Sequence, residues 1–87
     1  MALSAHARQV ALTGDGLLVS ICTDGTVWFY SPSHQEWLCL VTGTVELTQV
    51  VFDASETTAF VLDVDGHLMS IDLALVRQSL NPSNLNK

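Results

Sequence analysis

Three histidines, His6, His34 and His67, are the side chains of this sequence best suited to ligate a metal or to transfer a proton near neutral pH. A zinc site needs three or four protein ligands brought together. His34 stands in a polar loop and His67 follows two aspartates, but the spacing within neither stretch assembles such a set. We therefore expect solvated loop histidines and no metal ion.

The stretch Asp63-Val64-Asp65-Gly66 carries carboxylates at alternate positions, as a calcium-binding loop does. Such a loop also needs further oxygen ligands at alternate positions and a distal bidentate glutamate. The corresponding stretch in the first half of the chain has only Asp24. We interpret both stretches as hairpin turns.

Ser20 and Cys22 are the side chains considered as nucleophiles. A nucleophile of this kind needs an adjacent base, and the sequence contains no Gly-x-Ser-x-Gly elbow. Packing in an apolar strand explains both residues. The sequence therefore predicts no catalytic residue, no cofactor and no enzymatic activity.

Aromatic residues are the most promising binding groups, because aromatic side chains concentrate binding energy at interfaces and also stack on sugar rings. The first half contains Trp28, Tyr30 and Trp37, with His34 nearby. Trp37 and His34 both flank one loop, so this pair is the first candidate for a binding site. A tryptophan on a strand more commonly packs between layers of the fold, and that alternative stays open for Trp28 and Trp37.

Composition favours association with other protein rather than with nucleic acid or membrane. The 87 residues are 48% hydrophobic and 14% charged, against about 25% charged in an average domain. The net charge is −6, and the three basic residues, Arg8, Arg77 and Lys87, are scattered. Nucleic acids and anionic membranes require clustered basic groups, so we expect neither as a partner. The apolar excess indicates subunits that bury surface against each other.

The ends and the cysteines indicate a cytoplasmic protein. The chain begins with Met1 and carries no visible tag, which is typical of a natural N-terminus, and residues 1–8 lack the features of a secretory signal. No apolar run approaches the roughly 20 residues of a transmembrane helix. Cys22 and Cys39 form no CxxC motif, and we expect both to be buried, reduced thiols.

Short apolar segments separated by turns predict an all-β fold. Asp-Gly between two apolar runs is a strong hairpin signal, because glycine accepts a positive φ, and we expect this conformation at Gly25 and Gly66. Residues 73–79 fit a strand but also fit a short helix, and the tail 81–87 is expected to be flexible. The expected strands are residues 9–12, 17–22, 27–30 and 37–42 in the first half, and 47–52, 58–62, 68–71 and 73–79 in the second.

The two halves repeat each other. Gln9-Val10 corresponds to Gln49-Val50 at an offset of 40, and Asp24-Gly25 corresponds to Asp65-Gly66 at an offset of 41, so one insertion lies between them near Thr57. The sequence therefore predicts one domain, 1–87, built from two repeats, 7–43 and 44–80. Nearly continuous apolar runs such as LLVSIC and AFVL predict sheets that are buried on both faces.

The turns and their flanking strands resemble the blades of the WD-repeat family of β-propellers. In that family a blade carries a first polar turn, an Asp-Gly-Thr-Val second turn and a closing Trp-Asp. Neither half here has the Trp-Asp pair, and Gly43-Thr44 lacks the family's histidine. The matching segments are 12–16, 24–27 and Tyr30-Ser31 in the first half, and 52–56, 65–68 and Ile71-Asp72 in the second.

The resemblance implies two four-stranded antiparallel blades and a function in binding rather than in catalysis. A propeller has four to eight blades, so two blades close into a ring only with other chains. Three or four copies would give six or eight blades, and alternatively the chain completes a larger propeller protein. We therefore expect a non-enzymatic interaction module or scaffold; a lectin-like propeller that binds sugars between blades is the alternative.

Overall fold

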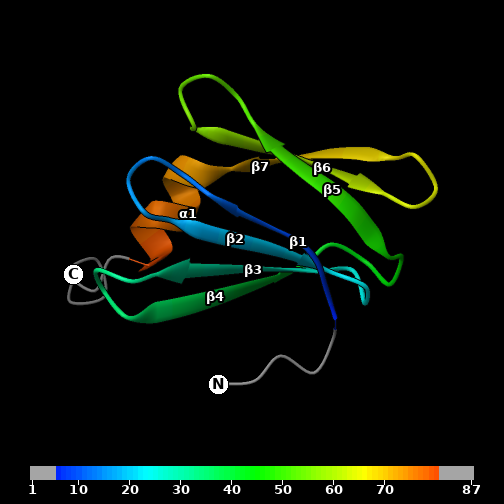
Figure 1. The fold of residues 1–87 in the computed structure, drawn as a ribbon, viewed down its shortest axis with the longest axis horizontal. Helices are drawn as coiled ribbons and strands as arrows, with labels where there is room; N and C mark the ends of the chain where they lie inside the picture. The colour runs from blue at the N-terminus through cyan, green and yellow to red at the C-terminus, as the bar shows by residue number, and fades with distance from the viewer. Residues whose placement is uncertain (1–5, 81–87) are drawn as a thin grey trace.

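The computed structural model describes residues 6–80, so the tail 81–87 that was expected to be flexible lies outside the described residues. These residues form two antiparallel sheets and one helix (Figure 1). The prediction of a mainly β, antiparallel fold is thus confirmed for the described residues, except for the helix. The first sheet contains β1 (Ala7–Leu12), β2 (Leu18–Cys22), β3 (Thr26–Ser31) and β4 (Glu36–Val41); the second contains β5 (Leu47–Phe52), β6 (Thr58–Asp63) and β7 (Leu68–Asp72), and helix α1 (Leu73–Leu80) follows.

Short turns join neighbouring strands in both sheets, so each sheet is a simple meander. The predicted positive φ is confirmed at Gly25 (85°) and Gly66 (88°) in the two Asp-Gly turns. In the first of these turns, the carboxylate of Asp24 accepts a 3.1 Å hydrogen bond from the main-chain N–H of Thr26. The side chain thereby holds the turn closed where the sequence predicted a hairpin.

The expected fourth strand of the second half, 73–79, is wrong: these residues form α1, so the second sheet has three strands. Leu73, Val76 and Leu80 are spaced three and four residues apart and are all buried, which is the period of a helix with one apolar face. The carboxylate of Asp72 accepts a 2.9 Å hydrogen bond from the N–H of Ala74 and so caps the first turn of the helix. A strand would have pointed Leu73 and Val76 to opposite faces.

A single hydrophobic core lies between the two sheets and α1. Strand β5 packs against β1 and β2, while α1 packs against β3 and β4, where the second sheet has no fourth strand (Figure 1). The main-chain N–H of Val50 donates a 2.8 Å hydrogen bond to Oε1 of Gln9, which links the two sheets directly. The buried core residues are Leu17, Val19, Ile21, Val27, Phe29, Leu47, Val50, Ala59, Val61, Ile71, Leu73, Val76 and Leu80.

The two halves have the same strand register. The pair Gln9↔Ile21 in the first sheet corresponds to Gln49↔Leu62 in the second, and each first strand is interrupted one step earlier by an irregularity. The correspondence continues through the third strands, at the offset of 41 that follows the insertion. Equivalent positions in the two sheets can therefore be compared one by one.

No helix within residues 6–80 is both long enough and apolar enough to cross a lipid bilayer.

Candidate interaction surface

The first sheet turns one face to the core and the opposite face away from the rest of the described chain. We call the second of these the outer face of the first sheet. The strand register arranges its side chains in two rows across the four strands, and every side chain in them is uncharged. One row contains Leu12, Leu18, Tyr30 and Trp37, and the other contains Val10, Ser20, Trp28 and Cys39.

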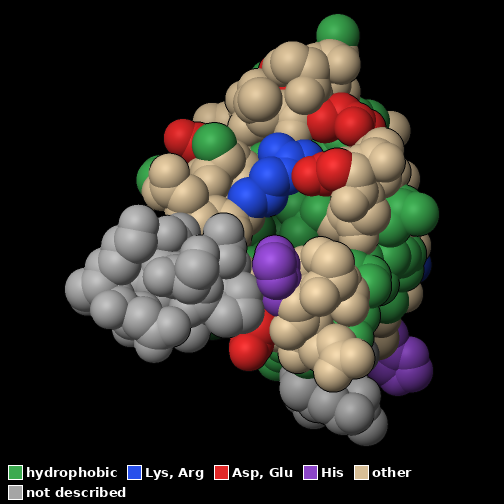
Figure 2. All heavy atoms as spheres, turned by 90° about the vertical axis from the view of Figure 1, so that its left-hand side faces the viewer, with side chains coloured by type: hydrophobic (Ala, Val, Ile, Leu, Met, Phe, Trp, Pro, Cys, Tyr) green, Lys and Arg blue, Asp and Glu red, His purple; other side chains and the backbone are tan. Residues whose placement is uncertain are grey.

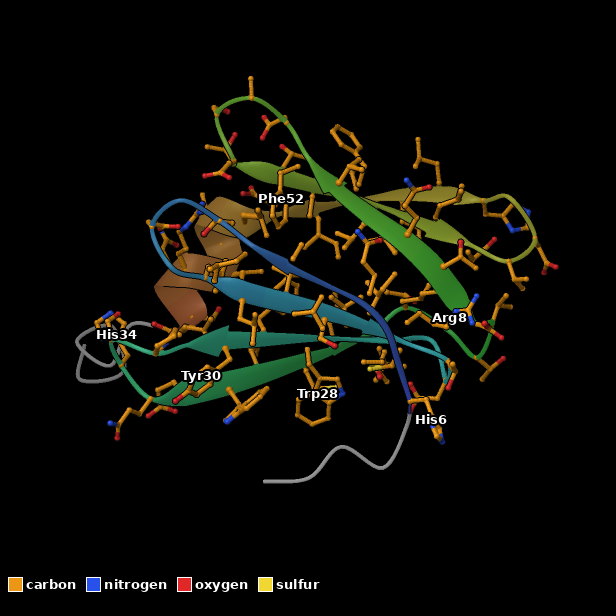
Figure 3. The ribbon with its side chains drawn as sticks, viewed as in Figure 1. His6, Arg8, Trp28, Tyr30, His34 and Phe52 are labelled. Carbon is orange, nitrogen blue, oxygen red and sulfur yellow. The ribbon has the colours of Figure 1, made fainter. Side chains whose placement is uncertain are left out.

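Three of the four predicted interaction residues meet on this face. Trp28 and Trp37 make an edge-to-face contact, with ring centroids 6.1 Å apart and an interplanar angle of 78°. The rings of Tyr30 and Trp37 lie closer, at 4.5 Å, and are tilted by 36°. Figure 3 shows Trp28 and Tyr30 projecting away from the second sheet. The aromatic cluster is therefore formed by β3 and β4 alone.

Large apolar side chains on the outer face of the first sheet are exposed. Leu12 is 63% exposed, Val10 55% and Trp37 39%. The sequence predicted sheets that are buried on both faces. Within this chain, β2 is the strand that best fits this prediction, because Val19 to Cys22 are all buried. A contiguous apolar surface of this kind is typical of a site that contacts other protein.

Two small residues, Ser20 and Cys39, lie among these apolar side chains. The hydroxyl of Ser20 is buried, and within residues 6–80 its oxygen has no hydrogen-bond partner. Cys22 and Cys39 are both free thiols; Cys22 is buried as predicted, but Cys39 is exposed, so that part of the prediction is wrong. The reason is that β4 is the edge strand and nothing in the described chain covers this side of it.

His34 lies apart from the aromatic cluster, in the turn between β3 and β4. It lines a hollow of about 210 Å³ together with Asp15, Ser31, Ser33 and Arg77. Figure 2 looks onto this end of the molecule, where a basic side chain lies between acidic side chains and above a histidine. The loop that joins His34 to Trp37 in sequence thus places the two residues in different surroundings.

Arg77 lines the hollow, and each of its three guanidinium nitrogens already makes a hydrogen bond within the chain. Its Nε lies 2.9 Å from Oδ2 of Asp15 and its second terminal nitrogen 3.1 Å from Oδ1. The other terminal nitrogen donates to the main-chain oxygen of Glu56 at 2.7 Å. The hydroxyl of Thr13 and the Arg77 guanidinium hold the pKa of Asp15 below its ordinary value. The arrangement ties α1 to one turn from each sheet.

The aspartates that begin two further turns, Asp53 and Asp63, accept hydrogen bonds from main-chain N–H groups of their own turns. Burial opposes ionisation of Asp63, but hydrogen bonds from the N–H and the ring of His67 outweigh it and lower its pKa. The N–H of Thr58 and the groups of the same turn lower the pKa of Asp53. The segment 63–66 is a hairpin turn, as predicted, and residues 6–80 contain no cluster of three metal-ligating side chains.

The second sheet also has an outer face, which the sequence had not singled out. Six of its side chains are uncharged: Gln49, Val51, Phe60, Leu62, Leu68 and Ser70. Thr58 and the charged Asp72 continue this face at its end next to α1. Val51 is 48% exposed and Leu68 66%. Both sheets therefore present largely apolar strands away from the shared core.

No model of a known protein family matches this sequence, and no curated protein is significantly similar to it.

Proposed function

We propose that this protein is a non-enzymatic assembly module whose outer sheet faces bind further β-sheets, so that it forms part of an oligomeric or composite β-propeller. The observation that carries the proposal is the outer face of the first sheet. Its two rows of uncharged side chains extend across all four strands, and one of them has the exposed Leu12 and Trp37 at its two ends.

The energy of covering this face is large for a small domain. Apolar surface is stabilised by about 25 cal/mol for each Å² removed from water. Covering a few hundred Å² on each outer face would thus contribute several kcal/mol, which is comparable to the total stability of a small domain. Folding and assembly are then coupled, and the melting temperature rises with protein concentration.

The arrangement of the two sheets supports a propeller in particular. Strand β5 packs on β1 and β2, so the first strands of the two halves are neighbours. The equal register of the halves and the resemblance of their turns to propeller blades agree with this stacking. Three or four copies would supply six or eight sheets, within the usual range. The free thiols of Cys22 and Cys39 fit a cytoplasmic location.

Cys39 offers a direct test, because it lies on the outer face of the first sheet and is exposed, whereas Cys22 is buried. Alkylation with iodoacetamide at alkaline pH should modify Cys39 rapidly in the dilute purified chain. Alkaline conditions are needed because partial loss of hydration and the nearby Asp24 raise the pKa of this thiol. In a fresh extract of cells that make the protein, we expect Cys39 to react at least tenfold more slowly.

Cys22 is the internal control and should stay unmodified in both samples while the fold is intact. An equal rate for Cys39 in dilute chain and extract would contradict the proposal. Protection by added oligosaccharides in the absence of other protein would contradict it too, and would favour the lectin alternative.

A further inference from the structure

The two sheets contribute opposite faces to the shared core. The core residues of β2 are Val19 and Ile21. Their equivalents in β6, Phe60 and Leu62, do not face the core but lie on the outer face of the second sheet.

The reverse comparison gives the same result. The core residues of β6 are Ala59 and Val61. Their equivalents in β2, Leu18 and Ser20, lie on the outer face of the first sheet.

The third strands follow the same rule. The core residues Val27 and Phe29 of β3 correspond to Leu68 and Ser70 of β7, which lie on the outer face. The second sheet is therefore stacked on the first in the same orientation, front against back. A pair related by a two-fold axis would have buried the same face of both.

This stacking leaves two unlike faces open, and each is a version of a face that is already paired inside the chain. The residues on the outer face of the second sheet are the repeat equivalents of those on the inner face of the first sheet. In the same way, the residues on the outer face of the first sheet are the equivalents of those on the inner face of the second. The two open faces could therefore pack against each other as the two inner faces do.

We infer that the outer face of the first sheet binds the outer face of the second sheet of another copy of this chain, in a head-to-tail arrangement. The inference rests on the proposed function and names its partner. It also names the contact that must recur: Gln9 accepts a hydrogen bond from the N–H of Val50 inside the chain. The equivalent residues are Gln49 and Val10, so Gln49 of one copy accepts a hydrogen bond from Val10 of the next.

Charge and size are compatible with this pairing. Neither the two rows of the first sheet nor the six central outer-face side chains of the second contain a charged group. The one charged side chain on the outer face of the second sheet, within residues 6–80, is Asp72 at its end, where the carboxylate caps α1. Side-chain volumes differ between the halves: Trp28 and Tyr30 are larger than their equivalents Met69 and Ile71, whereas Ser70 is much smaller than its equivalent Phe29. Ser70 would therefore leave local room on the second sheet opposite the bulkier first sheet, while Phe60 and Val51 are larger than Val19 and Ala11 and would have to pack elsewhere on the face.

The arrangement favours a closed ring. The outer face of the first sheet measures about 19 Å by about 17 Å in projection, from strands about 4.8 Å apart and residues about 3.3 Å apart. The area buried by one pair of outer faces of this size is below the roughly 1,200 Å² that standard stable interfaces bury. Head-to-tail contacts that close into a ring give every copy two interfaces, whereas contacts that do not close give filaments.

Complementary variants test the pairing. Leu12→Asp places a charge on the outer face of the first sheet, and Leu68→Asp does so on that of the second; both side chains are mostly exposed, so the fold should tolerate the changes. We expect the unmodified chain to assemble and each variant alone to be monomeric in analytical ultracentrifugation. A 1:1 mixture retains one intact head-to-tail interface, so it should form a heterodimer, but only at protein concentrations well above those at which the unmodified chain assembles.

The outcomes separate this inference from the proposed function. If Leu68→Asp alone forms a dimer, like faces pair and the head-to-tail arrangement is overturned. If the unmodified chain stays monomeric while Cys39 is protected in the extract, the partner is a different protein and only the second-copy inference fails. If Cys39 is unprotected as well, both fail. If Leu12→Asp or Leu68→Asp loses the circular dichroism of a β-sheet, a second variant of the same sheet is used in its place. These variants are Val10→Asp for the first sheet and Val51→Asp for the second, and both residues are exposed on the outer faces.

The two glutamines give a matched pair of substitutions. Gln49→Ala should weaken assembly about fivefold per interface, the equivalent of one hydrogen bond of about 1 kcal/mol, with no effect on the melting of the monomeric Leu12→Asp chain. Gln9→Ala should lower the melting temperature of that same monomeric chain, because its hydrogen bond to Val50 is internal. Unchanged assembly by Gln49→Ala would contradict the named contact.

Discussion

The guanidinium of Arg77 forms a two-pronged ion pair with the carboxylate of Asp15, 62 residues earlier in the chain, at 2.9 and 3.1 Å. The same side chain donates to the main-chain oxygen of Glu56. One residue of α1 therefore joins the turn that follows β1 to the turn that follows β5. A planar guanidinium can make these contacts at once because its donors point in several fixed directions.

Arg77→Ala should destabilise the protein by about 1 kcal/mol, the effect of losing charge-assisted hydrogen bonds at a partly exposed site. Arg77→Lys should recover part of this stability, since it keeps the charge but not the two-pronged geometry. Urea unfolding followed by circular dichroism measures both. Arg8→Ala is the control: Arg8 makes an exposed ion pair with Glu46 at 3.1 Å, and we expect its loss to cost less than about 0.5 kcal/mol. Equal effects at Arg8 and Arg77 would contradict the role assigned to Arg77.

Ser20→Ala should stabilise the chain by about 1 kcal/mol. The Ser20 hydroxyl is buried without a partner among residues 6–80, and an unsatisfied buried polar group carries the full cost of its desolvation. The equivalent position in the second sheet is Val61, an apolar core residue. Thermal unfolding of the monomeric Leu12→Asp chain measures the change without a contribution from assembly, and Ser70→Ala in the same chain, at an exposed serine, is the neutral control. A lower melting temperature for Ser20→Ala would show that the hydroxyl has a partner in solution.

Acid should destabilise the fold below about pH 4. The pKa values of Asp15, Asp53 and Asp63 are all held below the ordinary value, which is about 3.9. The folded state therefore binds protons less readily than the unfolded chain. The stability that these carboxylates contribute is fully present above the ordinary pKa and is lost as the pH falls through the lowered values.

Melting temperatures measured from neutral pH down to about pH 2.5, in salt sufficient to screen the net charge, test this expectation. The curve should be flat to about pH 5 and then fall. Asp63→Asn should reduce stability at neutral pH and make the acid decline shallower, because one of the three titrating groups is removed. A melting temperature that stays constant or rises below pH 4 would rule out the assignment.

Much of the strand pattern was predictable, because turn residues and apolar runs alternate regularly. The prediction for β5 was confirmed at both ends, and β2 differs from its prediction only by starting at Leu18 instead of residue 17. The segment 73–80 was ambiguous because its apolar residues fit both periods in part: Leu73 and Leu75 alternate as in a strand, whereas Leu73, Val76 and Leu80 have the spacing of a helix. Asp72 just before it was the available signal for a helix, since aspartate is a preferred N-cap residue.

The orientation of the sheets was not predictable from the pattern. Both faces of β2 and β6 are largely apolar, so alternation does not reveal which of Leu18 and Val19 points to the core. The Arg77–Asp15 link was hidden for a different reason: it joins residues that only the packing of α1 brings together. The aromatic cluster of Trp28, Tyr30 and Trp37 could be anticipated because β3 and β4 are adjacent in sequence, whereas His34 sits in the intervening turn and belongs to another surface.

Substitution of the turn glycines separates backbone strain from steric collision. Gly25 and Gly66 occupy equivalent turns with φ of 85° and 88°, so alanine is strained at both, by about 1 kcal/mol. At Gly25 an added Cβ would also lie 2.8 Å from the carbonyl carbon of Gly43, whereas at Gly66 it would meet nothing within 4 Å. The N–H of Thr42 donates to the main-chain oxygen of Gly25 at 3.0 Å, so the two backbones cannot separate without breaking this contact.

Gly25→Ala should therefore destabilise the protein by at least about 2 kcal/mol more than Gly66→Ala, since overpacking adds to the strain. Gly14→Ala should have the smallest effect, because its φ is not positive and an added Cβ would meet only the flexible end of the Glu56 side chain, at 3.3 Å. Chemical denaturation of the three variants gives the order directly. Equal losses at Gly25 and Gly66 would mean that the segment around Gly43 moves aside, and the close packing of the first Asp-Gly turn against the chain that leads into β5 would then be wrong.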